Sequence, residues 1–573
     1  MTGAPETAVP LPPRDRLFKM RAFLFPPRKR KDDSMLYDDS QMNSYPVLTP
    51  EDMRRTEQKA FALGVSSLLL MEHAAIAVVD ALEKALGGSC AEKRVLFLCG
   101  TGNNGGDGLA AARLFKMRGG WPTVWLYGEP KTPDAQTNLR WLHLVLREEN
   151  ILNLAPLPEE ELPFDGESPK QPFDGYVDAL LGTGFRGRID SPLLSRMALA
   201  PYHDFHLGMA HMPPVVAVDI PSGINGKTGE AEWPFVHADV TVTFNTPKPG
   251  LYLTQEREAV GKIVVADIGL WDMMPWNSDV LLLDDLELNC EALQPSALRF
   301  LTRRAVNAHK GDNGRMLIYA GKMGMAGAAA MCAKAAVTAG AGLTTVLCEK
   351  EIISILQTLV PNAMCLDIKE AIENPPACDV LALGCGLGQS DEIWQNILAL
   401  WNPEKPSVWD ADALNLLAKH PMKLGKHAVI TPHPGEAARL LGRSTEEILA
   451  DRMAAAQALA ETFDCTAVLK SDVTVICAIT EDGPEFRLNT VGSPALAKGG
   501  SGDALTGILA ALLWDYDEET RSPLPFSIDD VALACLWHGM AGIVGEKKYG
   551  QRELTTDQLI SCLHDAEQGE HFK

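Results

Sequence analysis

The sequence predicts two α/β units in tandem, the first of them built on a mostly parallel, doubly wound sheet that helices cover on both faces. Three observations support this fold class. The chain has 573 residues, more than a single hydrophobic core usually organises. Short apolar runs alternate with amphipathic helical stretches from residue 46 to about 270, and again from about 303 onward. Between them the pattern lapses into acidic sequence with Trp and Pro, so we expect a boundary near 277–285 and units at 44–277 and 278–573.

Residues 1–43 differ in composition from both units. They mix prolines with the basic run Arg28–Lys31 and show no helical or strand period, which predicts an unstructured leader. A basic tetrapeptide can be an address or a nucleic-acid patch, but a solvated tail is the simpler interpretation, and the acidic residues argue against an organellar transit peptide. Met35 or Met42 could also be the true start.

The overall composition is that of a soluble, folded protein. Hydrophobic residues make up 46% of the chain and charged residues 22%. The net charge of −23 disfavours nucleic acid and anionic lipid as partners, so we expect small-molecule substrates. We find no apolar run near the roughly 18 residues that a membrane span needs. The 12 cysteines form no CxxC pair and several lie in apolar runs, which predicts reduced core thiols and a cytoplasmic location.

In the first unit, six apolar runs are expected to be the buried strands of a parallel sheet. They cover residues 94–99, 123–127, 176–182, 215–220, 239–244 and 262–270. The segment 153–175, with its Pro, Glu and Gly, is expected to be a surface loop.

A glycine-rich turn follows the first of these strands, in the stretch "CGTGNNGGDGLAAARLF" from Cys99 to Phe115. Glycines let a backbone approach a ligand, and the free N–H groups at the start of the following helix attract an anion such as a pyrophosphate. The turn therefore favours a dinucleotide site. Tight turns also use glycine without any ligand, and the spacing departs from the common GxGxxG pattern.

Two further strand ends carry carboxylates, Asp178 in "VDALLGTG" and Asp219 in "VDIPSGING". Ligands of open parallel sheets lie beyond the carboxyl ends of the strands, so Asn104, Asp178, Asp219 and Ser222 are predicted to converge there. Each Asp alone could be a cap or turn former. Three polar loops at neighbouring strand ends make the shared site the better interpretation.

These motifs, with "VVAVDIPSGINGKTG" and "TFNTPKPGL", resemble the NAD(P)HX epimerase family, the YjeF N-terminal domain, over nearly all of 46–270. The resemblance implies a Rossmann-like fold that binds the hydrated reduced nicotinamide dinucleotide and a potassium ion. It implies substrate contacts from Asn103, Asn104, Gly105, Gly106, Asp107, Gly182, Thr183, Gly184, Phe185, Arg186, Gly187, Arg188 and Asp219. The implied potassium ligands are Asn104, Asp178 and Ser222, oxygen donors that suit a hard cation. We assign Asp219 as the carboxylate that moves the proton when the hydroxylated ring carbon is inverted.

In the second unit, seven strands are predicted before two closing helices at about 502–514 and 529–544. The strands cover 316–321, 343–348, 380–386, 406–412, 427–433, 466–470 and 473–479. The first of the closing helices follows "AKGGSGD", in which backbone N–H groups can hold phosphate and Asp503 can take a proton from an attacking hydroxyl. The alternative is a plain glycine-rich helix cap with an Asp near the positive end of the dipole.

The ordered motifs "HKGDNGRML", "GCGLG", "WDADALNLL", "ITPHPGEAARLL", "KSDVT" and "GGSGD" resemble the ADP- or ATP-dependent NAD(P)HX dehydratase family, a ribokinase-like fold, over about 290–570. The resemblance implies that Ala328, Gly386, His433 and Asp503 contact the hydrate. It implies that Lys470, Ser471, Asp472, Val473, Thr474 and Gly502 hold the adenine nucleotide, with magnesium on its phosphates. Asp503 would deprotonate the ring hydroxyl, which takes the terminal phosphate, and phosphate would then leave. Asp410 and Asp412 are expected to fix the strand end, and His433 taken alone could be a satisfied loop histidine.

The chain departs from the dehydratase pattern at four positions: Ser471 and Ala495 replace usual glycines, Cys385 a usual proline and Asn362 a usual glutamate. These departures bear on nucleotide affinity and leave the choice between ADP and ATP open. Two other hypotheses remain. One is a kinase for a small alcohol, which the same fold and base would serve, and the other is a first unit that only binds a nucleotide or partner. We also expect a homo-oligomer.

Overall fold

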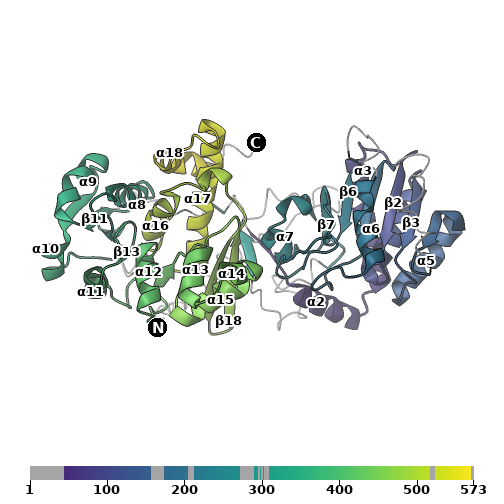
Figure 1. Ribbon diagram of the computed structural model, residues 1–573, viewed down its shortest axis with the longest axis horizontal. Helices are drawn as coiled ribbons and strands as arrows, with labels where there is room; N and C mark the ends of the chain where they lie inside the picture. The colour runs from purple at the N-terminus through teal and green to yellow at the C-terminus, as the bar shows by residue number, and fades with distance from the viewer. Residues whose placement is uncertain are drawn as a thin grey trace, which may run out of the picture.

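Two α/β units lie side by side in the computed structural model (Figure 1). It describes residues 44–156, 173–203, 212–270, 290–293, 297–298, 301, 309–516, 523–524 and 526–568. The leader expected at 1–43 and the boundary expected near 277–285 lie outside the described residues, and most of the loop 153–175 does so too.

The first sheet has seven parallel strands in the order β4-β3-β2-β5-β6-β7-β8. Their bounds are β2 Arg94–Cys99, β3 Trp121–Leu126, β4 Ile151–Asn153, β5 Gly175–Ala179, β6 Val215–Val218, β7 Val240–Phe244 and β8 Lys262–Ala266. The six strands predicted from the sequence are confirmed, and β4 was not predicted. The chain order reverses between β2 and β5, and such a switch point opens a crevice at the carboxyl ends of the strands.

Helices cover both faces of this sheet. They are α2 Pro50–Ala62, α3 Ser67–Ala85, α4 Asn103–Met117, α5 Pro133–Val145, α6 Pro192–His203 and α7 Pro249–Leu253. Side chains of β2 alternate between the two layers: Phe97 packs in one core with α3 and α4, and Leu98 packs in the other with α6. This two-sided burial explains why β2 is apolar at nearly every position.

The second sheet has eleven strands in the order β1-β9-β18-β17-β16-β15-β14-β13-β10-β11-β12. From β16 to β12 the neighbours are parallel, and β17 is antiparallel to both β16 and β18. The strands are β1 Ser44–Pro46, β9 Cys290–Leu293, β10 Arg315–Tyr319, β11 Leu343–Cys348, β12 Met364–Asp367, β13 Val380–Leu383, β14 Ser407–Trp409, β15 Ala428–Ile430, β16 Thr466–Leu469, β17 Thr474–Thr480 and β18 Gly483–Asn489. All seven predicted strands are confirmed, whereas β1, β9, β12 and β18 were not predicted. A two-stranded hairpin, β19 Asp515–Tyr516 with β20 Pro523–Leu524, stands apart.

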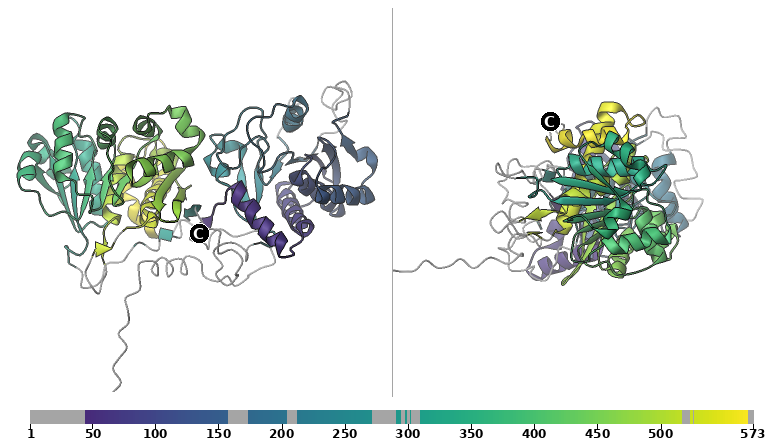
Figure 2. Two further views of the ribbon diagram at one scale, coloured as in Figure 1. Left: turned by 90° about the horizontal axis from the view of Figure 1, so that it is seen from below. Right: turned by 90° about the vertical axis from the view of Figure 1, so that its left-hand side faces the viewer.

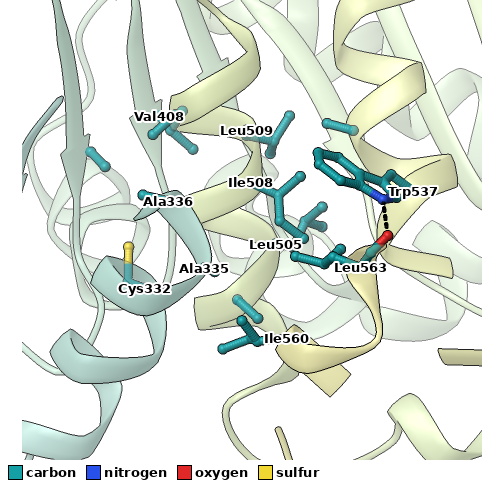
Figure 3. Close-up of a cluster of buried hydrophobic side chains, with 14 of the residues drawn as sticks. Cys332, Ala335, Ala336, Val408, Leu505, Ile508, Leu509, Trp537, Ile560 and Leu563 are labelled. Atoms are coloured by element: carbon teal, nitrogen blue, oxygen red, sulfur yellow. Dashed lines mark hydrogen bonds between the residues drawn. The ribbon is translucent and has the colours of Figure 1, made fainter. Parts of the chain in front are cut away.

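The helices of the second unit pack on both faces of its sheet. They are α8 Ala326–Thr338, α9 Ile353–Leu359, α10 Ile368–Glu373, α11 Asp391–Leu400, α12 Asp412–Lys419, α13 Pro434–Leu441, α14 Thr445–Ala450, α15 Arg452–Phe463, α16 Ser501–Leu512, α17 Ile528–Tyr549, α18 Thr556–Ser561 and α19 Leu563–Gln568. Figure 3 shows Leu505, Ile508 and Leu509 of α16 between α8 and α17. A Cβ at Gly507 would lie 2.1 Å from the carbonyl oxygen of Cys332, so glycine lets α16 and α8 touch backbone to backbone.

Helix α17 corrects one sequence expectation. Its 22 residues have a mean hydropathy of 1.2 over the best window, so the chain does hold one helix long and apolar enough to cross a membrane. Within the structure 78% of that window is buried, and Trp537 donates from Nε1 to the carbonyl oxygen of Leu563 at 2.8 Å (Figure 3). The middle of the helix is apolar because protein surrounds it, whereas Lys547 and Lys548 in its last turn are exposed.

The chain segment before α2 joins the two units. β1 pairs antiparallel with β9 at the edge of the second sheet, and α2 then packs on the first unit (Figure 2). Val47 lies just before α2, and Tyr252 and Leu253 lie in α7 of the first unit. All three are nevertheless buried in a core cluster of the second unit. The contact between the units therefore includes apolar burial as well as strand pairing.

Two candidate active sites

The glycine-rich turn between β2 and α4 serves mainly close packing. A Cβ at Gly105 would lie 1.9 Å from the carbonyl oxygen of Gly100, and one at Gly108 would lie 2.5 Å from the Cβ of Ala179 on β5. Gly106 is similarly blocked by Met71, whereas a Cβ at Gly102 would meet nothing within 4 Å. The glycines thus bring α4 onto the sheet, and only part of the turn faces open space.

The three oxygen donors predicted to hold potassium lie together. Asp178, fully buried at the end of β5, accepts hydrogen bonds from the Ser222 backbone N at 2.7 Å and from Ser222 Oγ at 2.6 Å. Asn104 lies against Gly182, 3.1 Å from the position of a Cβ there, and its buried side-chain nitrogen has no partner among the described residues. Burial raises the pKa of Asp178 to about 6, and the two hydrogen bonds from Ser222 oppose that rise. The buried carboxylate of Asp178 is an oxygen ligand that fits a hard cation, whereas the unpartnered nitrogen of Asn104 is a hydrogen-bond donor and does not ligate one.

Asp219 forms an ion pair that the sequence did not predict. It follows β6 with a φ of +66°, and its Oδ1 accepts from Lys248 Nζ at 2.6 Å and from Thr243 Oγ1 at 3.1 Å. Lys248 is 1% exposed and also donates to the carbonyl oxygen of Phe244 at 3.2 Å. The only signal for Lys248 in the sequence was its place in "TFNTPKPGL", directly after β7. The positive φ of a residue other than glycine is a feature that clusters at functional sites.

Two more carboxyl groups share the electrostatic surroundings of Asp219. Burial raises the pKa of Glu57 on α2 to about 6, a rise that Lys248 opposes and Asp219 reinforces. Burial, followed by the charges of Asp219 and Glu57, raises the pKa of Asp107 well above its usual range. The site thus combines two carboxyl groups of raised pKa, Glu57 and Asp107, with an acid that is paired to a lysine.

The remaining residues predicted to bind the dinucleotide lie around this site with different exposure. Gly105 and Gly106 are buried, whereas Asn103 and the loop Gly184–Arg188 are largely exposed and Gly182 and Thr183 lie at intermediate depth. Arg186 crosses to α2, where its Nη2 donates to Glu51 Oε1 at 2.5 Å. α2 thereby joins the wall of the site, a role that the sequence did not indicate.

In the second unit, Asp503 lies in the first turn of α16 behind Gly500, which has a φ of +93°. Burial raises the pKa of Asp503 to about 6, while a hydrogen bond from Cys385 lowers it. A carboxylate with such a pKa is ionised at neutral pH and still basic enough to accept a proton from a hydroxyl.

Asp410 joins the first turns of α16 to the predicted nucleotide loop. It is 2% exposed, and its two carboxylate oxygens accept from Lys470 Nζ at 2.7 Å and from Thr506 Oγ1 on α16 at 3.0 Å. A Cβ at Gly502 would lie 3.4 Å from Lys470 Nζ, so the two segments predicted to hold the nucleotide adjoin each other. Asp412 accepts from the Gly388 backbone N at 2.7 Å. Both aspartates therefore fix strand ends and loops, as the sequence indicates.

The residues predicted to contact the hydrate lie along the same edge of the sheet. Ala328 at the start of α8 lies beside Gly386, 3.1 Å from the position of a Cβ there. His433 caps α13: its Nδ1 accepts from the Gly435 backbone N at 3.1 Å, and its side chain is 53% exposed. His433 therefore has the structural role of a helix cap. Its Nε2 lies 3.5 Å from Glu436 Oε1.

The nucleotide loop Lys470–Thr474 is only partly accessible. Val473 is 1% exposed, so its side chain belongs to the core, whereas Ser471 Oγ donates to Asp472 Oδ1 at 2.9 Å. Among the four departures, Cys385 is buried beside Asp503 and Ala495 is buried, whereas Asn362 is exposed. The described part of the chain contains no group of three or more His, Cys, Asp or Glu side chains able to hold a metal ion.

None of the eleven cysteines that the structure describes forms a disulfide, and most of them are buried. Burial raises the pKa of several of them, for example Cys90 to about 11, which makes such thiols unreactive.

Comparison with known proteins finds the same two halves. A family model described as YjeF-related protein N-terminus matches residues 67–250, and one described as NAD(P)H-hydrate dehydratase matches residues 316–564. The bifunctional NAD(P)H-hydrate repair enzyme Nnr of Escherichia coli is 35% identical over 539 residues, which cover 92% of this chain and 96% of that protein. The chain belongs to this family of bifunctional repair enzymes.

Relatives of the repair-enzyme family also occur outside bacteria. The bifunctional NAD(P)H-hydrate repair enzyme of Leishmania major is 34% identical, covering 86% of this chain and 88% of its own. Among solved structures, an ADP/ATP-dependent NAD(P)H-hydrate dehydratase from Bacillus subtilis, co-crystallized with ATP and Mg²⁺, is 28% identical, covers 48% of this chain and 96% of its own, and has a TM-score of 0.42. The predicted family and order of the two halves are confirmed.

Proposed function

We propose that this repair enzyme restores hydrated NADH and NADPH at two sites. The first site interconverts the R and S hydrates, and the second dehydrates the S hydrate with ADP or ATP as phosphate donor. The observation that carries the proposal is an acid at each strand-end site with a lysine nearby. Asp219 pairs with Lys248, and Asp503 lies in the field of Lys470, which itself pairs with Asp410.

In the first site, Asp219 is assigned to the proton of the ring hydroxyl. Lys248 holds its Oδ1 at 2.6 Å, and the carboxylate is assigned to shuttle the hydroxyl proton as water departs from the ring carbon and returns to its other face. Glu57 and Asp107, whose pKa values burial raises, share the electrostatic surroundings of Asp219. Asn103–Asp107 and Gly182–Arg188 are assigned to the dinucleotide.

In the second site, Asp503 takes the proton of the ring hydroxyl as the hydroxyl oxygen attacks the terminal phosphorus of the adenine nucleotide. The bond to the nucleotide breaks, and the phosphorylated ring carbon then loses inorganic phosphate together with a neighbouring ring proton, which leaves the dihydropyridine. Lys470–Thr474 and Gly502 are assigned to the nucleotide, and Ala328, Gly386 and His433 to the hydrate. Magnesium on the nucleotide phosphates would offset the charge that develops during transfer.

The activity is tested by the time course of reduced-nicotinamide absorbance. Purified protein is mixed with the separated R and S hydrates of NADH, magnesium, potassium and either ADP or ATP. Recovery of both epimers, dependent on nucleotide, is expected. A net phosphorylated product without recovery would instead indicate a kinase for another alcohol, and no nucleotide-dependent change would contradict the proposal.

The cytoplasmic location and the homo-oligomeric state inferred from the sequence stay predictions.

Potassium is assigned to Asn104, Asp178 and Ser222. Since burial raises the pKa of Asp178 to about 6, its ionised form is costly near neutral pH, and a bound cation would offset that cost. We expect 100 mM KCl to raise the melting temperature by about 2–4 °C relative to tetramethylammonium chloride at equal ionic strength. The shift should be lost in Ser222→Ala. Equal melting temperatures in both salts would contradict the assignment.

The pKa of Asp503 predicts the pH dependence of dehydration. The pKa lies near 6, and the ionised form is the base, so kcat/KM should be constant above pH 7 and fall about tenfold per unit well below pH 6. Because the Cys385 hydrogen bond lowers this pKa, Cys385→Ala should move the fall to higher pH. A profile that is flat down to pH 5 would contradict the role of Asp503 as base.

A further inference from the structure

Arg452 is a buried cation that belongs to neither proposed site. It is 1% exposed and is among the largest fully buried side chains of the described chain. It is also the first residue of α15, a position where the helix dipole disfavours a positive charge. Its place must therefore be explained by contacts outside its own helix.

Those contacts join the two units. Arg452 Nη1 donates to Asp472 Oδ1 and, at 3.4 Å, to the carbonyl oxygen of Val473, both in the nucleotide loop. Arg452 Nη2 donates to the carbonyl oxygen of Leu253 in the first unit, 199 residues away in the chain. One planar guanidinium thus holds the nucleotide loop and the end of α7 at the same time.

The end of α7 is in turn fixed by the first site. α7 begins directly after Lys248, whose Nζ pairs with Asp219. A Cβ at Gly250 would lie 2.0 Å from the carbonyl oxygen of Asn225, and the Gly250 backbone N donates to the carbonyl oxygen of Gly226. α7 is thereby pressed onto the loop that follows Ser222, and it lies on the side of the first unit that faces the second (Figure 1).

We propose that Arg452 is a positioning residue for the adenine nucleotide, and that it sets the nucleotide loop against the first unit through the carbonyl oxygen of Leu253. This inference rests on the proposed assignment of Lys470–Thr474 to the nucleotide. Ser471 adds its own hydrogen bond to Asp472. Ser471 and Arg452 therefore donate to the same oxygen of the loop, Asp472 Oδ1.

Arg452→Met is a clean test of this contact. Methionine fills similar space, and the partner that loses its charge pair, Asp472, is 48% exposed and stays solvated. Removing one partner of a buried ion pair usually costs stability, but water can solvate the half-exposed Asp472, so the cost should be smaller here. We expect the KM for ADP or ATP to rise about tenfold while kcat and the KM for the S hydrate stay within about twofold. Arg452→Lys, which can reach only one of the two acceptors at a time, should lie between.

The control is Arg487→Met. Arg487 is also buried in the second unit, but its Nε donates to Asp529 at 2.6 Å, away from the nucleotide loop. Leaving Asp529 without that donor should cost stability, so this variant shows whether instability alone raises the nucleotide KM. A nucleotide KM for Arg452→Met within twofold of the native value would overturn the inference.

Hydrogen exchange on the full chain tests the same contact without depending on catalysis. Hydrogen exchange should become faster in Arg452→Met at both 470–474 and 249–254, and at neither segment in Arg487→Met. If the native protein fails to dehydrate the hydrate, the proposed function fails, and this measurement alone decides the contact between the units. Unchanged exchange at either segment overturns the inference whatever the activity.

Discussion

Asp503→Asn should lower the rate of nucleotide-dependent dehydration about a thousandfold, close to 4 kcal/mol of transition-state stabilisation. Asparagine keeps the shape of the side chain but cannot accept the hydroxyl proton. Burial raises the pKa of Asp503 to about 6, so the folded protein holds an ionised carboxylate at a cost at pH 7. The variant should therefore melt at the same temperature as the native protein or slightly higher.

Activity and stability are thus expected to move in different directions. The measurement is the rate of absorbance recovery from the S hydrate under saturating nucleotide, beside the thermal unfolding curve. Asp557→Asn, which removes an exposed carboxylate of α18 that pairs with Lys334, is the matched control and should change neither. A loss of less than about tenfold in Asp503→Asn would show that another group is the base.

Asp219→Asn should lower the rate of epimerisation at least a hundredfold, with dehydration of the S hydrate unchanged. Its effect on stability differs from that of Asp503→Asn. Lys248 is 1% exposed, and its ion pair with Asp219 would be lost, although its bonds to Thr243 and Phe244 would remain. Breaking one side of a buried pair costs about 3 kcal/mol or more.

The double variant Asp219→Asn with Lys248→Met separates the two effects. Removing both charges should restore most of the lost stability without restoring epimerisation. Recovery from the R hydrate is the readout of epimerisation, and recovery from the S hydrate is the readout of dehydration. Asp80→Asn serves as the control. Asp80 lies on α3, is partly exposed and pairs with Arg118. If the double variant regained epimerisation along with stability, Asp219 would be structural.

The strands that the sequence predicted are those that the sheet buries on both faces. β2 and β13 are continuous apolar runs, so their composition alone marks them. The strands that were not predicted lack this signal: β18 reads "GPEFRLN" and β12 is partly exposed at the edge of the second sheet. Their pairing depends on neighbours far away in the chain, which local composition does not report.

The same distinction applies to the sites. Asn104, Asp178 and Ser222 were predicted to converge because each follows a strand of one parallel sheet, and the structure brings them together. Lys248 and Arg452 were not predicted, because the contacts that define them cross 29 and 199 residues of sequence. The glycines of the first turn were interpreted as a ligand surface, yet several are required by helix-to-sheet packing.

The pairing of β1 with β9 has a consequence for synthesis of the chain. Tyr45 lies opposite Ala292, so the first strand leaves the ribosome roughly 10 to 50 seconds before its partner can be made. During that interval the first unit can fold, but β1 stays unpaired until β9 has been synthesised. If the second unit were produced alone from residue 278, β9 would become the open edge of the sheet, and an unpaired edge is where a sheet recruits strands from other chains. The fused gene therefore delivers the covering strand before the edge that needs it exists.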